Sequence, residues 1–550
     1  MVRRFRDSSL FLFFGLSLAF LWLVFPAIQR TIFGNDTYKT VDWDLRKLVE
    51  TKSQGAFDFG QNNDTLLKVY HPSLSLYYSL DGGDHFLKDQ DNHLQIAEIR
   101  NTGLIYQSTS IRWRHPKGEF PSVKSLRIKL RDEVKMEESE EKVFTYFEQT
   151  KSDLPVVSIN MSSDDLIGWE NGIMVPGASA MNDSGFYKAW WYRSANFANR
   201  GNDWAKKVMV HYFDKGELKA EFPSQLRISG NATRYFPQKS MKFYPLDSLG
   251  RKDKLNFPFW GEARNKKSES FLLRNGGNDN SKTLFADLLM HRLAKNANLL
   301  VLEGFPVSVF INGNYWGIYN LRERLDAYFI AKREGKKEGD VTILYCEVYG
   351  HESLLKEGDL KHKLAFDSLI SDLPKKGELD KEVYDRIKDQ ISIKSFIDYI
   401  IFETFYANGD WLHNNTTWFK AKNGQWKWIL NDLDCGLAYQ GKNQVELNMF
   451  KILSKSDAIT ARMFNALLTK KKFKKKFKKR VFEILATDLS EIKIKETFAS
   501  LKKQYQADIY LQINRWRSIH SVDEWEKNCA NNLTFLLERR ISYLKHVEEL

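Results

Sequence analysis

The chain has few cysteines, and this scarcity narrows the classes of protein to which it can belong. Only Cys346, Cys435 and Cys529 occur among its 550 residues. An odd number at wide spacing indicates neither a disulfide framework nor a zinc site, although one bridge between two of them stays open. Cys435 directly follows Asp434, where we interpret it as a small buried residue rather than a nucleophile.

A sequence motif for reading nucleic acid is also absent, although the net charge is +13. The basicity is local: nine of the eleven residues from Lys470 to Arg480 are basic, and removing nine positive charges from +13 leaves +4. The run predicts an amphipathic helix with a solvated lysine face. An anionic membrane surface or an acidic substrate is the functional alternative, and we expect no nucleic-acid partner. The apolar residues at helical spacing are Phe473, Phe477, Val481 and Ile484.

One long apolar run stands near the beginning of the chain. Leu10 to Ile28 carries no charge and is preceded by Arg3, Arg4 and Arg6. Such a run predicts a membrane segment whose basic end stays inside, so the remaining chain should face outward as part of the cell envelope or as a secreted protein. A cleaved signal peptide and a retained anchor are both open, and the length of the run favours the anchor.

The length predicts two or more domains, and the 43% hydrophobic content excludes a disordered chain. We expect a signal or anchor over 1–30, a linker over 31–63, a β-sandwich over 64–140 and a larger domain over 150–550. The segment LSLYYSLDGGDHF, Leu74 to Phe86, resembles the small sandwich domain at the C-terminus of chitobiases. That resemblance implies a spacer or a sugar-contacting module. The charge cluster Lys135 to Lys142 is a candidate joint to the larger domain.

The larger domain mixes strand and helix patterns, so the fold class is α+β. Strands are expected near 208–213, 226–228 and 241–244, and a helix should begin at Ser281. Asn312-Gly313 between two β-rich runs predicts a hairpin with a type I′ turn. Ser392 can cap a helix that stops at Asn408-Gly409, and the chain after Asp434 is helical in pattern.

The stretch Asn408 to Asp434 contains a second Asn-Gly pair, Asn423-Gly424. If these two residues form the turn, Phe419 faces Trp428 and Asn415 faces Asp432. Asp410 and Asp434 flank this open end. Three carboxylates and an amide near one point predict a site for Mg²⁺ or Mn²⁺, although a polar surface hairpin is the simpler alternative.

The order of these residues is the one used in protein kinases. There, an Asp takes the hydroxyl proton, an Asn follows to hold a metal, and a later Asp binds Mg²⁺ between the phosphates. This order assigns Asp410 as the base and Asn415, Asp432 and Asp434 to the metal. Paired carboxylates and exposed aromatics also suit a glycosidase, but that hypothesis does not account for the intervening Asn415.

Four ordered segments between residues 154 and 440 resemble the spore coat protein H (CotH) kinase family. They are LPVVSINMSSDDLIGWENGIMVPG, LRISGNATRYFPQKSMKFYP, NGNYWGIYNLRERLDAYFI, and NGDWLHNN followed by WKWILNDLD. The resemblance implies a reduced, atypical protein-kinase-like fold over 150–550, in a secreted or surface protein that uses ATP.

The resemblance also implies residues that hold the nucleotide. Lys239 and Lys242 lie three apart, so they should point to opposite faces of a strand, and the family pattern favours Lys239. Glu323 would be its ion-pair partner, and Arg234 would contact phosphate. Arg274 and Asp279 resemble another polar family segment without an assigned role.

The chain departs from the pattern in two places: no GxGxxG loop covers the phosphates, and Asn431 stands where many members carry Trp. Neither departure removes a reactive group. The resemblance implies a kinase that phosphorylates Ser or Thr of an extracytoplasmic protein. The alternative is a non-catalytic surface adhesion or scaffold protein.

Overall fold

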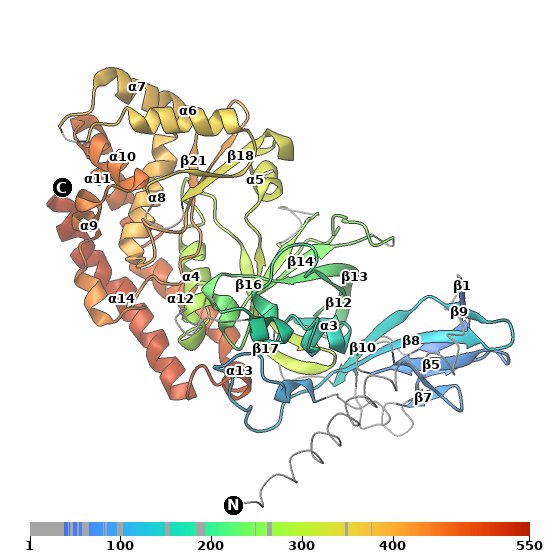
Figure 1. Ribbon diagram of the computed structural model, residues 1–550. Helices are drawn as coiled ribbons and strands as arrows, with labels where there is room; N and C mark the ends of the chain where they lie inside the picture. The colour runs from blue at the N-terminus through green and yellow to red at the C-terminus, as the bar shows by residue number, and fades with distance from the viewer. Residues whose placement is uncertain are drawn as a thin grey trace, which may run out of the picture.

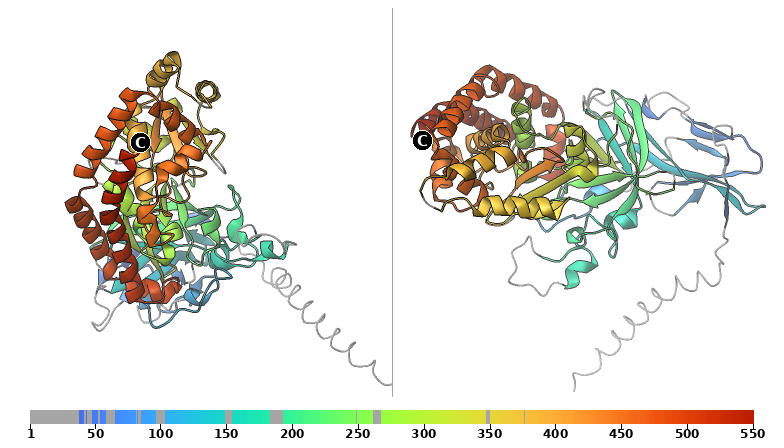
Figure 2. Two further views of the ribbon diagram at one scale, coloured as in Figure 1. Left: turned by 90° about the vertical axis from the view of Figure 1, so that its left-hand side faces the viewer. Right: turned by 90° about the horizontal axis from the view of Figure 1, so that it is seen from above.

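The computed structural model describes residues 38–41, 43, 48–51, 54–57, 65–80, 82, 85–95, 103–148, 154–182, 193–247, 249–260, 267–346, 350–375 and 377–550. The hydrophobic segment Leu10–Ile28 lies outside these residues. None of the helices that the structure describes combines the length and the apolar character needed to cross a membrane. The fold is a mixed α+β architecture, as the sequence predicts, with strands toward one end and helices gathered at the other (Figures 1 and 2).

The N-terminal region contains two groups of strands. The first is a sheet in the order β2-β4-β7, and the second, with β1, β9, β8, β10, β5 and β6, is the N-terminal part of one 14-stranded sheet, which β3 joins to β13 (Glu217–Ile228). Leu67 and Leu94 of the first share a buried cluster with Leu76, Leu126 and Ile128 of the second. The strands are β1 (Lys39–Val41), β2 (Val49–Thr51), β3 (Gly55–Phe57), β4 (Thr65–Val69), β5 (Ser75–Ser79), β6 (Leu87–Lys88), β7 (His93–Gln95), β8 (Lys124–Asp132), β9 (Glu137–Ser139) and β10 (Lys142–Glu148).

This region is larger than the sequence suggests. The predicted linker contributes strands, because β1 pairs with β9 and β2 pairs with β4. The charge cluster 135–142 is a turn and strand inside the region rather than a joint, since β10 continues the ladder with β8. The resemblance to the chitobiase module stays a prediction.

The central sheet continues in the order β13-β12-β11-β16-β17-β15-β14, with β13 also pairing with β14. The three strands expected near 208–213, 226–228 and 241–244 are confirmed as antiparallel neighbours. The strands are β11 (Val156–Asn160), β12 (Lys206–Asp214), β13 (Glu217–Ile228), β14 (Met241–Pro245), β15 (Phe271–Arg274), β16 (Gly304–Ile311) and β17 (Asn314–Glu323).

The predicted hairpin at Asn312-Gly313 is confirmed. Ile311 pairs with Asn314, so the loop has two residues. Both take positive φ, 46° at Asn312 and 77° at Gly313, as a type I′ turn requires.

A separate sheet in the order β19-β18-β20-β21 lies among the helices. Its strands are β18 (Val341–Cys346), β19 (Leu354–Glu357), β20 (Thr416–Ala421) and β21 (Lys427–Ile429). Trp418, Trp426 and Trp428 of this hairpin are buried in the core of the helical half.

The helices follow the apolar periodicity, with one shifted boundary. The helix expected from Ser281 begins five residues later, because Gly277–Ser281 forms a 3₁₀ turn first. The helices are α3 (Ser163–Ile167), α4 (Ala286–Leu293), α5 (Ala327–Glu334), α6 (Leu360–Ser371), α7 (Lys381–Gln390), α8 (Ile393–Tyr406), α9 (Met449–Lys455), α10 (Ile459–Leu468), α11 (Lys471–Ala486), α12 (Glu491–Gln506), α13 (Ile509–Trp516) and α14 (Val522–Glu548).

All three cysteines are buried free thiols.

Candidate active site

The loop after α8 positions Asp410. Ser392 caps α8 as predicted, accepting a hydrogen bond from the Ser395 N–H. The helix stops at Tyr406, one turn before Asp410, because Ala407 takes a left-handed φ of 48°. The Asn408 side chain then donates to the Glu403 carboxyl at 3.1 Å, which ties the loop to the helix.

Asp410 is held by two amides. Its Oδ2 accepts hydrogen bonds from Asn415 Nδ2 at 2.9 Å and Asn414 Nδ2 at 3.4 Å. Burial and the negative charge of Asp432 raise the pKa of Asp410, while the two amides oppose this rise. Asp410 is thus an oriented carboxyl group whose proton affinity is increased, which suits a general base.

The predicted register of the Asn423-Gly424 hairpin is wrong by one residue. Trp418 pairs with Trp428 and Phe419 pairs with Lys427, so five residues, 422–426, connect the two strands, and of the Asn-Gly pair only Asn423 has positive φ. Asn415 consequently does not face Asp432 across a ladder and instead donates to Asp410.

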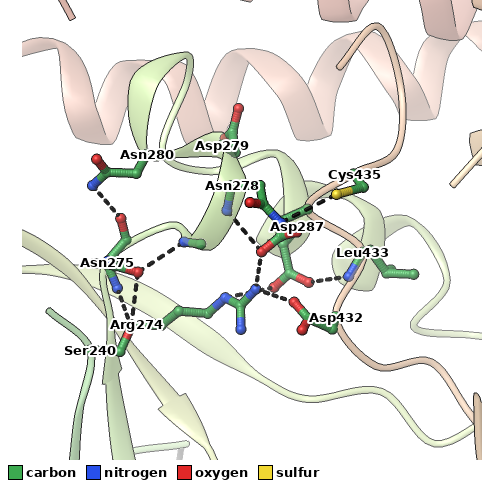
Figure 3. A network of polar contacts seen from close by, with 12 residues as sticks. Ser240, Arg274, Asn275, Asn278, Asp279, Asn280, Asp287, Asp432, Leu433 and Cys435 are labelled. Atoms are coloured by element: carbon green, nitrogen blue, oxygen red, sulfur yellow. Dashed lines mark hydrogen bonds and ion pairs between the residues drawn. The ribbon is translucent and has the colours of Figure 1, made fainter. Parts of the chain in front are cut away.

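Asp432 and Asp434 nevertheless converge on one point, and that point is a guanidinium nitrogen. Nη2 of Arg274, at the end of β15, donates to Oδ1 of Asp432 and, at 2.5 Å, to Oδ2 of Asp434 (Figure 3). The Asp434 side chain is 4% exposed and that of Asp432 is 36% exposed. Asp432 therefore opens toward solvent, while Asp434 forms the floor of the site.

The two carboxyl groups differ in their affinity for a proton. Burial and the charge of Asp432 raise the pKa of Asp434 to about 7. Burial acts on Asp432 in the same direction, but the Arg274 guanidinium outweighs it and keeps the pKa of Asp432 below its usual value. The Arg274 guanidinium holds Asp432 and Asp434 together, because two adjacent carboxylates without a cation between them would repel each other.

The turn 276–278 closes over Asp434. Asn278 donates its backbone N–H to Asp434 Oδ2 at 3.0 Å and its side-chain amide to Oδ1 at 2.9 Å (Figure 3). Gly277 packs directly against the carboxylate, since a Cβ at this residue would lie 1.8 Å from Asp434 Oδ2. Asp279 accepts the N–H groups of Thr283 and Ala286, so it orders the start of α4.

Asp287 in α4 joins the site to the sheet. It pairs with Arg322 of β17, lies 3.9 Å from Arg274 Nε, and accepts the Leu433 N–H at 2.9 Å. The carboxyl is buried, so its charge depends on these partners. Asp287 thereby fixes the segment that carries Asp432 and Asp434.

The predicted ion pair between Lys239 and Glu323 is contradicted. Lys239 has no exposed surface, and its Nζ donates to the carbonyls of Arg234 and Phe236. Glu323 pairs with Arg333 at 2.6 Å. Burial, with the Arg234 charge adding to it, lowers the pKa of Lys239 well below its usual value. Lys239 precedes β14, so its side chain turns into the interior.

Arg234 is also occupied by the protein itself. Its guanidinium donates to the carbonyls of Gly230, Phe197 and Ile228. It braces the loop GNATRYF, Gly230 to Phe236. A direct contact from Arg234 to phosphate therefore competes with these hydrogen bonds.

One face of the central sheet carries a row of cations. Arg227 pairs with Lys242, Lys242 with Leu272, and Leu272 with Arg322, so these side chains share a face. Arg274 lies two residues after Leu272 on β15 and points the same way. Arg324 directly follows β17 and lines the same cavity as Lys242, Arg274 and Arg322. We call Arg227, Lys242, Arg274, Arg322 and Arg324 the basic face.

Asp432 of the acidic pair and four cations of the basic face line one cavity of about 200 Å³; these cations are Lys242, Arg274, Arg322 and Arg324, and Lys356 lines it too. Within the described residues, Lys242 has no carboxylate partner. Burial and then the charge of Arg324 lower its pKa to about 8. A larger hollow of about 520 Å³ adjoins this cavity through Arg324.

The donor set fits a divalent cation in its chemistry. Asp432 and Asp434 are hard oxygen ligands that already converge on one point, and Mg²⁺ is commonly held by one or two carboxylates together with substrate phosphates. In the part of the chain that the structure describes, no three His, Cys, Asp or Glu side chains gather as a metal site. A cation here would rely on this pair and would compete with Arg274.

The sequence patterns do not predict that Asn278, Asp287, Arg322 and Arg324 belong to the site, and they give Arg274 no role. One signal was available for Asp287. It interrupts the apolar stretch LFADLLM, and a charge within a buried helix face needs a partner.

The fold and this site define an α+β protein in which an acidic pair and a basic sheet face border one cavity. The sequence model of the family described as "CotH kinase protein" matches residues 226–543, which is more than half of the chain. The protein therefore belongs to the CotH kinase family. No curated protein matches the chain.

Proposed function

We propose that this protein is a kinase that transfers the γ-phosphate of ATP to a Ser or Thr hydroxyl, on an atypical, reduced protein-kinase-like fold. One observation carries the proposal. Asp432 lines the same cavity as Lys242, Arg274, Arg322 and Arg324, and the negative charge of Asp432 acts to raise the pKa of Asp410. Phosphoryl transfer needs this combination of charge neutralisation and a positioned proton acceptor.

Lys242 and Arg324 are the candidates to bind the triphosphate. Lys242 is a partly buried cation without a carboxylate partner in the described part, so a phosphate would supply the missing counter-charge. Arg322 is committed to Asp287, and Lys239, Glu323 and Arg234 support the sheet and the loop from behind.

Asp410 would accept the proton of the acceptor hydroxyl. The hydroxyl oxygen forms a bond to the γ-phosphorus, the bond from that phosphorus to the β–γ bridging oxygen breaks, and ADP leaves with the electron pair. Asn414 and Asn415 hold the Asp410 carboxyl in place for this step. Asp432 and Asp434 would hold Mg²⁺ or Mn²⁺, with Asn415 a further ligand if its amide turns. When bound, the cation neutralises phosphate charge.

The substrate is proposed to be a secreted or surface protein. This rests on the sequence expectation that Leu10–Ile28 exports or anchors the chain in the cell envelope. The N-terminal sheets would act as a spacer or a carbohydrate-contacting module.

The test is transfer of labelled γ-phosphate by the purified chain to itself or to a generic protein acceptor, with Mg²⁺ and with Mn²⁺. Asp410→Ala should abolish transfer, whereas Asp389→Ala, which removes an exposed carboxyl elsewhere, should not. Absence of transfer with either cation would contradict the proposal.

The second candidate is a non-catalytic adhesion or scaffold protein that binds nucleotide. The Arg274 bridge favours it, because a resident cation already satisfies the acidic pair. In that case ATP should raise the melting temperature without phosphate transfer, since a ligand of the native state stabilises it by mass action.

A further inference from the structure

Helix α11 presents a lysine-rich face that the proposed kinase site does not use. Phe473, Phe477 and Val481 pack into the core of the helical half, as predicted from their spacing. The opposite side of the helix is exposed to solvent and lies on the outer flank of the molecule, away from the sheets (Figures 1 and 2). The exposed lysines are Lys471, Lys472, Lys475, Lys476 and Lys479. We call these five residues the α11 lysine face.

Most of this charge is not neutralised by the protein. In the described part of the chain, Lys471, Lys472, Lys475 and Lys476 form no ion pair with a carboxylate. Lys479 lies 3.7 Å from Glu483. The neighbouring helix α12 differs, because its Lys495 and Lys502 pair with Glu491 and Glu526. The α11 lysine face therefore keeps an excess of positive charge.

A hollow beside the helix extends the charged surface. It has a volume of about 300 Å³, and Lys394, Lys476 and Lys479 stand around it. The carboxyl group at its base, Asp398, is already paired with Arg480 through two hydrogen bonds of 2.8 and 2.9 Å. Glu483 also lines the hollow and pairs with Arg480, so the lysines at the rim face carboxyl groups that already have a cationic partner.

Exposed apolar side chains accompany the lysines. Phe482 is 54% exposed and lies on the same side of α11 as Lys471, Lys475 and Lys479. Helix α14 runs antiparallel beside α11, since Lys478 contacts the Glu548 carbonyl and Arg540 the Leu485 carbonyl. On α14, Ile541 is 66% exposed.

We propose that the α11 lysine face, with Phe482, binds the surface of a bilayer containing anionic lipids. A cationic helix with an aromatic residue on its outer side, about 24 Å long at 1.5 Å per residue, can lie flat in the headgroup region. An acidic polypeptide would neutralise the lysines, but it would not explain why the Phe482 side chain is exposed beside them. Glu483 lies near the end of α11 and α14 brings Glu548 beside Lys478, so Lys471, Lys472 and Lys475 in the first turns keep their charge without a carboxylate partner in the described part. The proposal is independent of phosphate transfer.

The test is sedimentation of the full chain with vesicles of phosphatidylcholine alone and with vesicles that also contain phosphatidylglycerol. All variants share residues 1–37, so the ratio of the two partition coefficients removes any binding by that segment. Lys471→Gln, Lys472→Gln and Lys475→Gln together should lower the ratio about a hundredfold, at about fivefold per lysine. The matched control Lys336→Gln, Lys337→Gln and Lys361→Gln removes the same charge from exposed sites elsewhere.

Phe482→Ala separates a bilayer from an acidic polypeptide. It should weaken binding to anionic vesicles several-fold while leaving binding to poly-glutamate unchanged. The proposal is overturned if the two lysine triples lower the ratio equally. It is also overturned if the chain binds poly-glutamate through α11 and shows no preference for anionic vesicles.

Discussion

The substitution Gly277→Ala tests whether Gly277 packs directly against Asp434 and Arg274. Gly277 has φ of +62°, and a Cβ there would lie 1.8 Å from Asp434 Oδ2 and 2.6 Å from Arg274 Nη2. Left-handed backbone costs a non-glycine residue about 1–2 kcal/mol. The Asp434 carboxylate must also move away, which breaks at least one charge-assisted hydrogen bond worth about 1.5–3 kcal/mol. Gly277→Ala should therefore destabilise the protein by about 3–5 kcal/mol.

Gly335→Ala is the matched control for the free-energy cost of placing a non-glycine residue in the left-handed region. Gly335 has φ of +64°, and no atom lies within 4 Å of the Cβ position, so only the left-handed cost applies. Urea midpoints of both variants, together with ATP affinity and phosphate transfer, form the assay. Gly277→Ala should lose more stability than Gly335→Ala and should lose transfer, whereas Gly335→Ala should keep it. Equal losses of stability with transfer retained in both variants would refute the described packing of Asp434.

Three further predictions concern individual charges. Lys242→Met should weaken ATP binding about tenfold or more in a calorimetric titration, because a charge-assisted contact is lost, while Lys239→Met should leave it unchanged; the reverse outcome would restore the family-based choice of Lys239. Arg274→Met should raise the affinity for Mn²⁺, measured by electron paramagnetic resonance, since the guanidinium no longer competes; an unchanged affinity would show that the two cations bind apart. Burial raises the pKa of Glu403 to about 8 from 4.5. The unfolded chain therefore loses this proton first as pH rises, and wild type should lose stability relative to Glu403→Gln, at about 1.4 kcal/mol per pH unit between about pH 5 and 8. Urea midpoints of the two proteins that stay parallel across this range would contradict the assignment of a neutral Glu403.

The two Asn-Gly pairs show how far turn chemistry determines a hairpin. Around Asn312-Gly313 the turn sets the register, and the predicted pairing is confirmed. At Asn423-Gly424 other contacts override it. β20 pairs with β18 as far as Ala421, and Trp426 exchanges backbone hydrogen bonds with Gln390 and Ser392. The ends of both strands are thus fixed by neighbouring elements, and the five residues between them, 422–426, adapt to this spacing.

The candidate site was predictable in its residue types but not in its partners. Asp410, Asp432 and Asp434 do approach one another, because helix α8 and the hairpin deliver them as the sequence order suggests. The family resemblance favours Lys239 over Lys242 and pairs it with Glu323, but Lys239 precedes β14 and donates to the carbonyls of Arg234 and Phe236 instead. Arg274 and Asp287 come from segments more than a hundred residues away, and single-sequence periodicity contains no information about which distant strand pairs with which.

The cations of the basic face give the central sheet one surface that suits phosphate binding. The alternation that buries Leu226, Met241, Phe243, Leu273 and Leu321 on one face of the sheet places the cations on the other. Arg227, Lys242 and Arg322 share one register row across the strands, so their spacing is set by the hydrogen-bonded ladder and not by flexible loops. Among the described residues, carboxylates pair with Arg274, Arg322 and Arg324, the last with Asp326 at 2.9 Å. Lys242 lies beside the cavity without a carboxylate partner in this part of the chain, and an anion placed there would lower the free energy of the whole cluster.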